Sequence, residues 1–231
     1  MIVSTYQPYF APYPGFFEKI LLSDVFVIMD SVQFPLGRSW LTRNRFKNDK
    51  GIYWVRVPVW RTGKGLQKIN EVKICYERDW TGKILRSFEM SYKNAPYFSE
   101  VIKEWEKLLI HIRPERLIDI NIYLIRCALN FLGINKKILL LSELGISLKE
   151  PELTLYICKE LKADKFLAQK SAKKYLDKSL FEKEGIELIF FNPRPCIYPQ
   201  LWGEFIPNLS VFDLIFNCGA KSLDIMKKAL L

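Results

Sequence analysis

The sequence predicts an α/β fold with a Rossmann-like, mostly parallel sheet, into which an antiparallel hairpin and a helical segment are inserted. In the first and last thirds of the chain, short apolar runs of strand length alternate with segments of helical period. A chain of 231 residues can bury one substantial core, and no low-complexity tract or flexible linker divides it. We therefore expect a single α/β domain over residues 1–231, with residues 52–133 as the inserted hairpin and helical segment.

The first elements are typical of a βαβ unit. Ile2–Thr5 is an apolar strand, Phe16–Asp24 has a helical apolar face, and Val25–Asp30 is a second apolar strand. The loop after the first strand, in "STYQPYFAPYPGFFEKI", is rich in rigid proline and aromatic residues. Ligands of open parallel sheets bind beyond the carboxyl ends of the strands. We therefore expect this loop and Asp30, with the residues after it, to form a ligand-facing rim.

The middle of the chain changes pattern. Ile52–Trp60 and Ile69–Cys75 alternate between apolar and polar residues, with a turn at "RTGKG" between them, and predict an antiparallel hairpin. Three helical segments follow, and the last of them ends at a glycine suited to a helix C-cap. They are Trp80–Tyr92, Phe98–Ile112 and Glu115–Gly133.

The last third returns to alternating strands and helices. The predicted strands are Lys137–Leu144, Asp164–Gln169 and Ile186–Asn192, and the predicted helices are Glu150–Ala163, Lys173–Gly185, Leu209–Gly219 and a last one from Ser222. With the two strands at the start of the chain, at least five parallel strands are expected.

The chain is basic, with 35 lysines and arginines against 25 acidic residues and a formal net charge of +10. Such an excess indicates an anionic partner, which could be nucleic acid, a membrane surface or a phosphorylated small molecule. The arginines are clustered in one region of the first third of the chain, at Arg38, Arg43, Arg45, Arg56 and Arg61. Because guanidinium groups grip phosphate and carboxylate oxygens with two donors, this cluster is the predicted anion site.

Several other classes of protein are disfavoured. Five widely spaced cysteines and one histidine, His111, support neither a disulfide framework nor a zinc site, and no Ser-His-Asp arrangement can be built. No apolar run is long enough to span a bilayer, and the start lacks the features of a signal peptide, so we expect a cytoplasmic protein. The sequence identifies no cofactor, and no carboxylate spacing demands Mg²⁺.

Distinctive motifs are spread over almost the whole chain. They include "QPYFAPYPGFFEKI", "DVFVIMDSVQF", "SWLTRNRFK", "YKNAPYF", "KFLAQKSAKKYLD" and "IYPQLWGEFIPNLSVFDLIFNCG". These motifs resemble those of the WbqC-like family of bacterial proteins. Members of the family tend to occur in gene clusters for surface polysaccharides such as O-antigen. The resemblance therefore implies a role near sugar-nucleotide or sugar modification.

Two positions depart from the family pattern. Tyr6 precedes Gln7 and Pro8 where relatives usually have His-Gln-Pro, and tyrosine, with an ordinary pKa of about 10, is a poor base near neutrality. Residues 169–172, "QKSA", stand where relatives usually have a Ser-Gly pair, which weakens a phosphate-loop role there. A looser similarity, to nucleotidyltransferases and pantothenate synthetases, suggests a nucleotidyltransferase-like arrangement.

The candidate site residues lie on the rim, in the arginine cluster and near the C-terminus. Asp30 and Asp213 are the candidates for proton transfer or amine binding. The candidate substrate-binding residues are Tyr6, Gln7, Tyr9, Gln33, Arg38, Trp40, Arg43, Asn44, Arg45, Tyr198, Gln200 and Asn217. Asp213 and Asn217 share one helix face with Ser210, and if buried this polar stripe needs hydrogen bonds from neighbouring loops or from a ligand.

The leading hypothesis is a transferase of lipopolysaccharide or O-antigen biosynthesis that binds a sugar nucleotide or amino sugar and transfers an acyl or aminoacyl group to a sugar amine. Its expected partner is an anionic small molecule such as a sugar nucleotide. Two alternatives remain. A nucleic-acid-binding module, motivated by the net charge of +10, is less favoured. The other is a non-catalytic subunit of a polysaccharide assembly complex.

Overall fold

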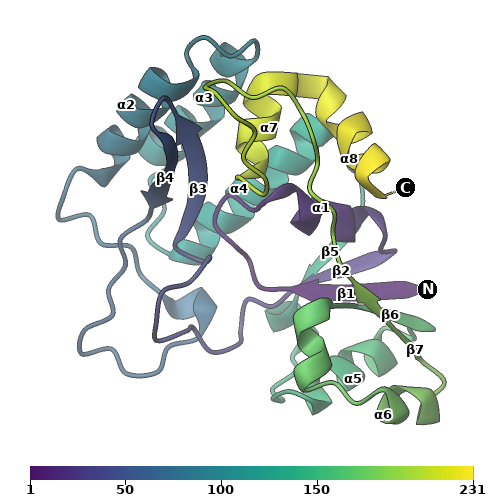
Figure 1. The fold of residues 1–231 in the computed structure, drawn as a ribbon. Helices are drawn as coiled ribbons and strands as arrows, with labels where there is room; N and C mark the ends of the chain where they lie inside the picture. The colour runs from purple at the N-terminus through teal and green to yellow at the C-terminus, as the bar shows by residue number, and fades with distance from the viewer. Residues whose placement is uncertain (231) are drawn as a thin grey trace.

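The computed structural model describes residues 1–230 and contains a five-stranded parallel sheet in the order β5-β2-β1-β6-β7 (Figure 1). The strands are β1 (Ile2–Tyr6), β2 (Val25–Ile28), β5 (Lys137–Leu140), β6 (Lys165–Gln169) and β7 (Glu187–Phe191). The chain builds the sheet outward from β1 to β5 and then returns to build the other half from β6. The predicted Rossmann-like parallel sheet is confirmed, and its topological switch point lies between β1 and β6.

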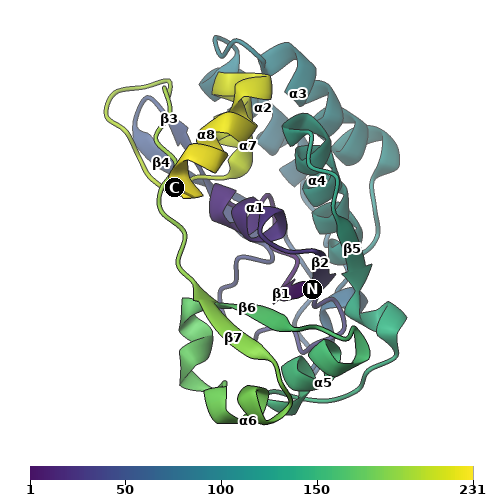
Figure 2. The ribbon, with the colours of Figure 1, turned by 90° about the vertical axis from the view of Figure 1, so that its right-hand side faces the viewer.

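Helices cover both faces of the sheet (Figures 1 and 2). On one face Phe26 and Ile28 belong to a core shared with α1 (Pro14–Leu21) and the C-terminal helices α7 (Val211–Cys218) and α8 (Ser222–Leu230). On the other face Val25 and Val27 pack in a second core with α5 (Glu152–Glu160) and α6 (Lys178–Lys183). Since both faces are buried, the central strands are apolar at successive positions rather than at alternate ones.

The hairpin differs from the prediction. The long pairing is β3 (Arg43–Asn48) with β4 (Gly51–Arg56), whereas the two stretches predicted to pair, Ile52–Trp60 and Ile69–Cys75, share one isolated bridge between Val59 and Ile74. The first stretch is therefore a strand, but its main partner lies before it in the chain. The prediction was wrong because it left out β3, in which half-buried Arg43 and Arg45 alternate with buried Asn44 and Phe46.

The inserted helices are α2 (Trp80–Tyr92), α3 (Phe98–Glu106) and α4 (Leu117–Leu132), and α3 continues into a π-helical turn over Lys107–Ile112. Gly133 ends α4 with φ +65°, as its position in the sequence predicted. One hydrophobic core runs from α1 through α4 to α2 and α3, which places the inserted segment against the same core as the sheet.

Two element boundaries in the last third also differ from the prediction. The predicted helix Lys173–Gly185 is a 3-10 turn over Lys170–Lys174 and the short helix α6, because Asp177 caps α6 by accepting a hydrogen bond from the backbone of Ser179. The strand predicted to reach Leu144 ends at Leu140, where a 3-10 turn begins. Within residues 1–230 we find no helix both long and apolar enough to cross a membrane.

Candidate functional site

A crevice of about 400 Å³ lies beyond the carboxyl ends of β1, β6 and β7, at the switch point of the sheet. This is where ligands bind in open α/β sheets. Its walls come from the first loop, the start of the hairpin and the segments that follow β6 and β7. The lining residues are Tyr6, Tyr9, Tyr13, Trp40, Asn44, Arg45, Gln169, Lys170, Ser171, Phe191, Asn192, Pro193 and Asn208.

The end of β1 and the proline-rich loop after it supply three tyrosines to the crevice. The rings of Tyr6 and Tyr9 pack edge to face with centroids 5.1 Å apart, and Tyr6 also packs on Phe16 at 5.1 Å. The hydroxyls of Tyr6 and Tyr13 lie 3.4 Å apart. Burial raises the pKa of Tyr9 to about 12 and raises that of Tyr6 further, so both phenols stay neutral hydrogen-bond donors near pH 7.

Asn44 fixes the shape of this loop. Its side-chain amide, which is buried, donates to the carbonyl oxygens of Phe10 at 3.1 Å and Ala11 at 2.7 Å, and its Oδ1 accepts from the backbone of Arg45 at 2.8 Å. Ala11 has φ +42°, a conformation that a residue with a side chain rarely adopts. Asn44 therefore ties the strained loop to the strand that carries Arg45.

Arg45 reaches the crevice from β3 of the hairpin, where it is half-buried. One Nη donates to the carbonyl of Asn208 at 2.7 Å, and the guanidinium lies 5.7 Å from the ring of Trp40. Its Nε is buried and has no hydrogen-bond partner among the described residues. A buried donor without an acceptor is uncommon in folded proteins, and here it lies beside a crevice that can hold an anion.

The charge of the crevice is positive. Arg45 lines it from β3 of the hairpin and Lys170 from the turn after β6, and no acidic side chain of residues 1–230 lines it. The remaining polar lining consists of neutral hydroxyl and amide groups. With two cations and no competing carboxylate, the crevice favours a ligand that carries phosphate or carboxylate oxygens.

Five of the predicted site residues line the crevice, namely Tyr6, Tyr9, Trp40, Asn44 and Arg45. The neighbouring Arg43 instead stacks over Trp54 at 4.3 Å, and Trp54 in turn packs on Trp40 with ring centroids 5.5 Å apart.

Three other predicted binding residues lie outside the crevice. Gln7 is half-buried beside it, and both Gln33 and Arg38 are exposed. The structure thus brings the first loop together with the start of the hairpin, but leaves these three side chains outside the set that lines the crevice.

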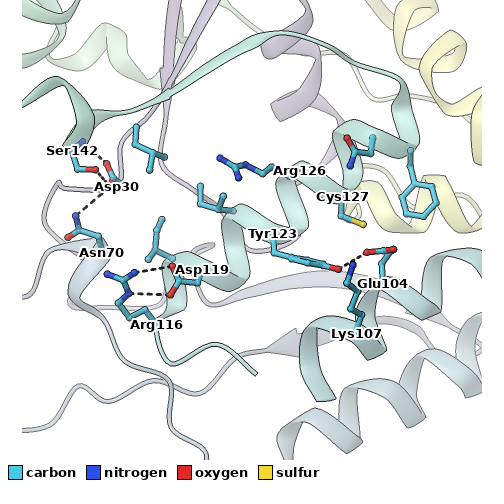
Figure 3. Close-up of a pocket in the computed structure, with 15 residues that line it drawn as sticks. Asp30, Asn70, Glu104, Lys107, Arg116, Asp119, Tyr123, Arg126, Cys127 and Ser142 are labelled. Carbon is cyan, nitrogen blue, oxygen red and sulfur yellow. Dashed lines mark hydrogen bonds and ion pairs between the residues drawn. The ribbon is translucent and has the colours of Figure 1, made fainter. Parts of the chain in front are cut away.

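Asp30 lines a different and larger cavity, of about 900 Å³ (Figure 3). It is 2% exposed and accepts hydrogen bonds from the backbone and hydroxyl of Ser142 at 2.9 and 2.6 Å, and from Asn70 at 3.4 Å. These bonds join the end of β2 to the turn after β5. Asp30 and Arg45 therefore line separate cavities.

The predicted residues near the C-terminus form a buried network outside both cavities. Asp213 accepts hydrogen bonds from the hydroxyls of Tyr92 at 2.6 Å and Tyr198 at 2.7 Å. Burial raises its pKa to about 6, although these bonds and the charge of Lys47 act in the opposite direction. Gln200 bonds both backbone groups of Ile206 and accepts from Lys47.

Asn217 completes this network. It accepts from the backbone of Leu201 at 3.3 Å and donates to the carbonyl of Asp213 at 2.7 Å. The sequence left open whether the hydrogen bonds of this polar stripe come from neighbouring loops or from a ligand. The bond from Leu201 to Asn217 and the bond from Tyr198 to Asp213 come from a neighbouring loop.

Several crevice residues are absent from the sequence-based predictions, above all Lys170, Asn192 and Asn208. Lys170 belongs to the segment whose departure from the family pattern argued against a phosphate-binding role. Only the strand order identifies Lys170 as a crevice residue, because it follows β6, and β6 lies beside β1 only in the folded sheet.

The fold and the crevice define a Rossmann-like α/β protein with a positively charged crevice at the switch point of its sheet. The sequence matches the WbqC-like protein family over residues 7–225, and the chain belongs to that family. It is 30% identical over 226 residues to Rv1507c of Mycobacterium tuberculosis (strain ATCC 25618 / H37Rv), a protein described as uncharacterized, with 97% of each chain covered. No solved structure matches the chain.

Replacing Gly15 by alanine is expected to disturb the crevice. A Cβ at this position would lie 2.5 Å from the ring of Tyr13 and 2.8 Å from the side chain of Pro193, and both residues line the crevice. Because these neighbours must move, we expect a loss of about 2 kcal/mol in unfolding free energy, measured by urea denaturation. The matched control is Gly37→Ala, where a Cβ meets no atom within 4 Å. Equal stability of the two variants would contradict this packing argument.

Proposed function

We propose that the chain binds a sugar nucleotide in the crevice between β1 and β6 and serves surface-polysaccharide biosynthesis. The observation that carries the proposal is the charge of the crevice, which Arg45 and Lys170 line without any acidic side chain of the described residues. The location at the switch point supports a nucleotide-like ligand, since open α/β sheets bind ligands there. The sugar part of the proposed ligand is inferred from the family, because WbqC-like proteins tend to occur in gene clusters for surface polysaccharides.

In this proposal Arg45 and Lys170 hold the phosphates from the two sides of the crevice. The Nε of Arg45, buried without a partner, gains an acceptor when a phosphate oxygen enters. The neutral hydroxyls of Tyr6, Tyr9 and Tyr13 donate hydrogen bonds to the ligand. Tyr6 would therefore act as a donor at the position where relatives usually have histidine.

The reaction, transfer of an acyl or aminoacyl group to a sugar amine, stays a prediction. Asp30 and Asp213, the candidates for proton transfer, line neither wall of the crevice. Chemistry at a ligand bound there would depend on positioning and on the charges of Arg45 and Lys170 rather than on a carboxylate base.

A thermal-shift titration with UDP-N-acetylglucosamine and GDP-mannose tests the proposal. At one hundred times its dissociation constant, a ligand stabilises the fold by about 2.7 kcal/mol, which corresponds to a rise in melting temperature of roughly 5 to 10 °C for a chain of this size. Arg45→Ala is expected to weaken binding at least about tenfold, because a hydrogen bond to a charged group is lost. The matched control is Arg56→Ala, an exposed arginine of β4 that does not line the crevice.

Two results would contradict the proposal. One is that neither sugar nucleotide stabilises the wild-type protein, which would favour a non-catalytic subunit. The other is that Arg45→Ala binds as tightly as Arg56→Ala. A DNA duplex, titrated at several salt concentrations, tests the nucleic-acid alternative, which expects log affinity to fall linearly with log salt.

A further inference from the structure

The larger cavity is a groove along α4, and its lining differs from that of the crevice at every residue. Its volume of about 900 Å³ is at the upper end of the range for small-molecule sites. Figure 3 shows α4 running through it, with the Asp30, Asn70 and Ser142 group at one end and Tyr123 with Glu104 toward the other. Eight residues of α4 line it, and among them Asp119, Ile122, Tyr123, Arg126 and Asn130 are spaced as one helix face.

All three acidic side chains in the groove have partners. Asp30 accepts from Ser142, with its shortest bond at 2.6 Å, and Glu104 accepts from the hydroxyl of Tyr123 at 2.6 Å. Asp119 pairs with Arg116 at 3.2 Å. Asp119 is thus neutralised by an ion pair, whereas Asp30 and Glu104 are held in place by hydrogen bonds from uncharged donors.

Two cations of the groove, in contrast, are free. Lys107 and Arg126 are exposed, and neither forms an ion pair with any residue in the part of the chain that the structure describes. The residues three and four positions from Arg126 on α4 are Ile122, Tyr123, Leu129 and Asn130, so no acid on its own helix neutralises it. Arg126 projects from the middle of the groove wall in Figure 3.

Between these charges the groove is apolar. Ile118, Ile122, Phe131 and Leu140 contribute from α4 and from the end of β5. An apolar floor beside two cations that form no ion pair among the described residues complements a ligand that has an apolar body and one negative group.

We propose that this groove is a second ligand-binding site, for a small organic anion with an apolar body. Its apolar part covers Ile122, Phe131 and Leu140, and its carboxylate or phosphate pairs with Arg126 and Lys107. The site is independent of the sugar-nucleotide proposal, because the two cavities share no lining residue.

Calorimetric titration of the full chain with octanoate tests the proposal, and octylammonium, with the same apolar body and the opposite charge, is the control ligand. Octanoate is expected to bind the wild-type protein more tightly than octylammonium. Arg126→Gln and Lys107→Gln should each weaken octanoate binding about twofold to fivefold, the range for an ion pair at an exposed site. Arg126→Glu should reverse the preference, and Ile122→Glu should abolish octanoate binding.

Two control variants locate the binding. Arg78→Gln removes an exposed arginine that lines neither cavity, and Arg45→Ala alters only the crevice, so both should bind octanoate as the wild-type protein does. The proposal is overturned if octanoate does not bind, if octylammonium binds equally well, or if Arg126→Gln leaves the affinity unchanged. Loss of octanoate binding in Arg45→Ala would also overturn it and would place the anion in the crevice.

Discussion

Lys19→Met is expected to stabilise the protein at neutral pH and to remove a dependence of stability on pH. Lys19 is 0% exposed, and its ammonium group donates to the carbonyl of Thr5 at 2.8 Å and lies 4.9 Å from the ring centre of Tyr6. No acidic side chain among residues 1–230 pairs with it. Burial therefore lowers its pKa from 10.5 to about 7.

The sign of the pH effect follows from the protons bound in each state. Between pH 7 and 10.5 the unfolded chain holds a proton on Lys19 that the folded chain has lost, so stability rises with pH. From pH 7 to about 8.5 the wild-type protein should gain on the order of 2 kcal/mol. Lys19→Met should show no such rise, and below pH 7 it should exceed the wild-type protein by a few kcal/mol.

Urea denaturation at several pH values between 6 and about 8.5 measures this difference. The range stops there because burial raises the pKa of Cys127 from 9 to about 12, which lowers stability at higher pH. Lys136→Met is the matched control, since Lys136 also donates to a backbone carbonyl, that of Ser23 at 2.9 Å, but is only half-buried. If the unfolding free energies of the wild-type protein and Lys19→Met change with pH in the same way, Lys19 is not a buried lysine with a lowered pKa.

The sheet could be predicted from the sequence because each strand is a short apolar run between amphipathic helices. Val25 and Phe26 belong to opposite cores, and their adjacency in the sequence already indicates a strand buried on both faces. The hairpin could not be predicted in the same way. In β3 the half-buried positions carry Arg43 and Arg45, and only the pairing with β4 shows that Asn44 and Phe46 alternate with them as the buried face.

The candidate site could be predicted in part. Tyr6, Tyr9 and Arg45 were identified because they follow a strand or belong to the arginine cluster, and the crevice contains them. Lys170 and Asn192 follow β6 and β7, which lie more than 150 residues along the chain from β1. Their approach to the first loop depends on the strand order β1-β6-β7, and local sequence pattern does not encode which strands become neighbours.

Asp213→Ala is expected to lower the unfolding free energy by about 4 kcal/mol. The carboxylate, 1% exposed, is the acceptor for Tyr92 and Tyr198, which are themselves buried, and its removal leaves both hydroxyls without that acceptor. Each buried polar group left unsatisfied costs about 1 to 3 kcal/mol. For a chain of this size, the melting temperature should fall by roughly 8 to 16 °C, measurable by calorimetry.

Asp213→Asn distinguishes a structural role of Asp213 from a catalytic one. The amide oxygen can still accept a hydrogen bond from one tyrosine, but the amide group cannot take up a proton. We expect it to be more stable than Asp213→Ala. The folded protein with aspartate binds more protons between pH 3.8 and about 6, so its stability falls as pH rises through that range, and Asp213→Asn should lack this fall. If Asp213 only supports the fold, folded Asp213→Asn binds sugar nucleotides as the wild-type protein does. A folded Asp213→Asn that binds normally but fails to transfer an acyl group would instead assign Asp213 the predicted catalytic role.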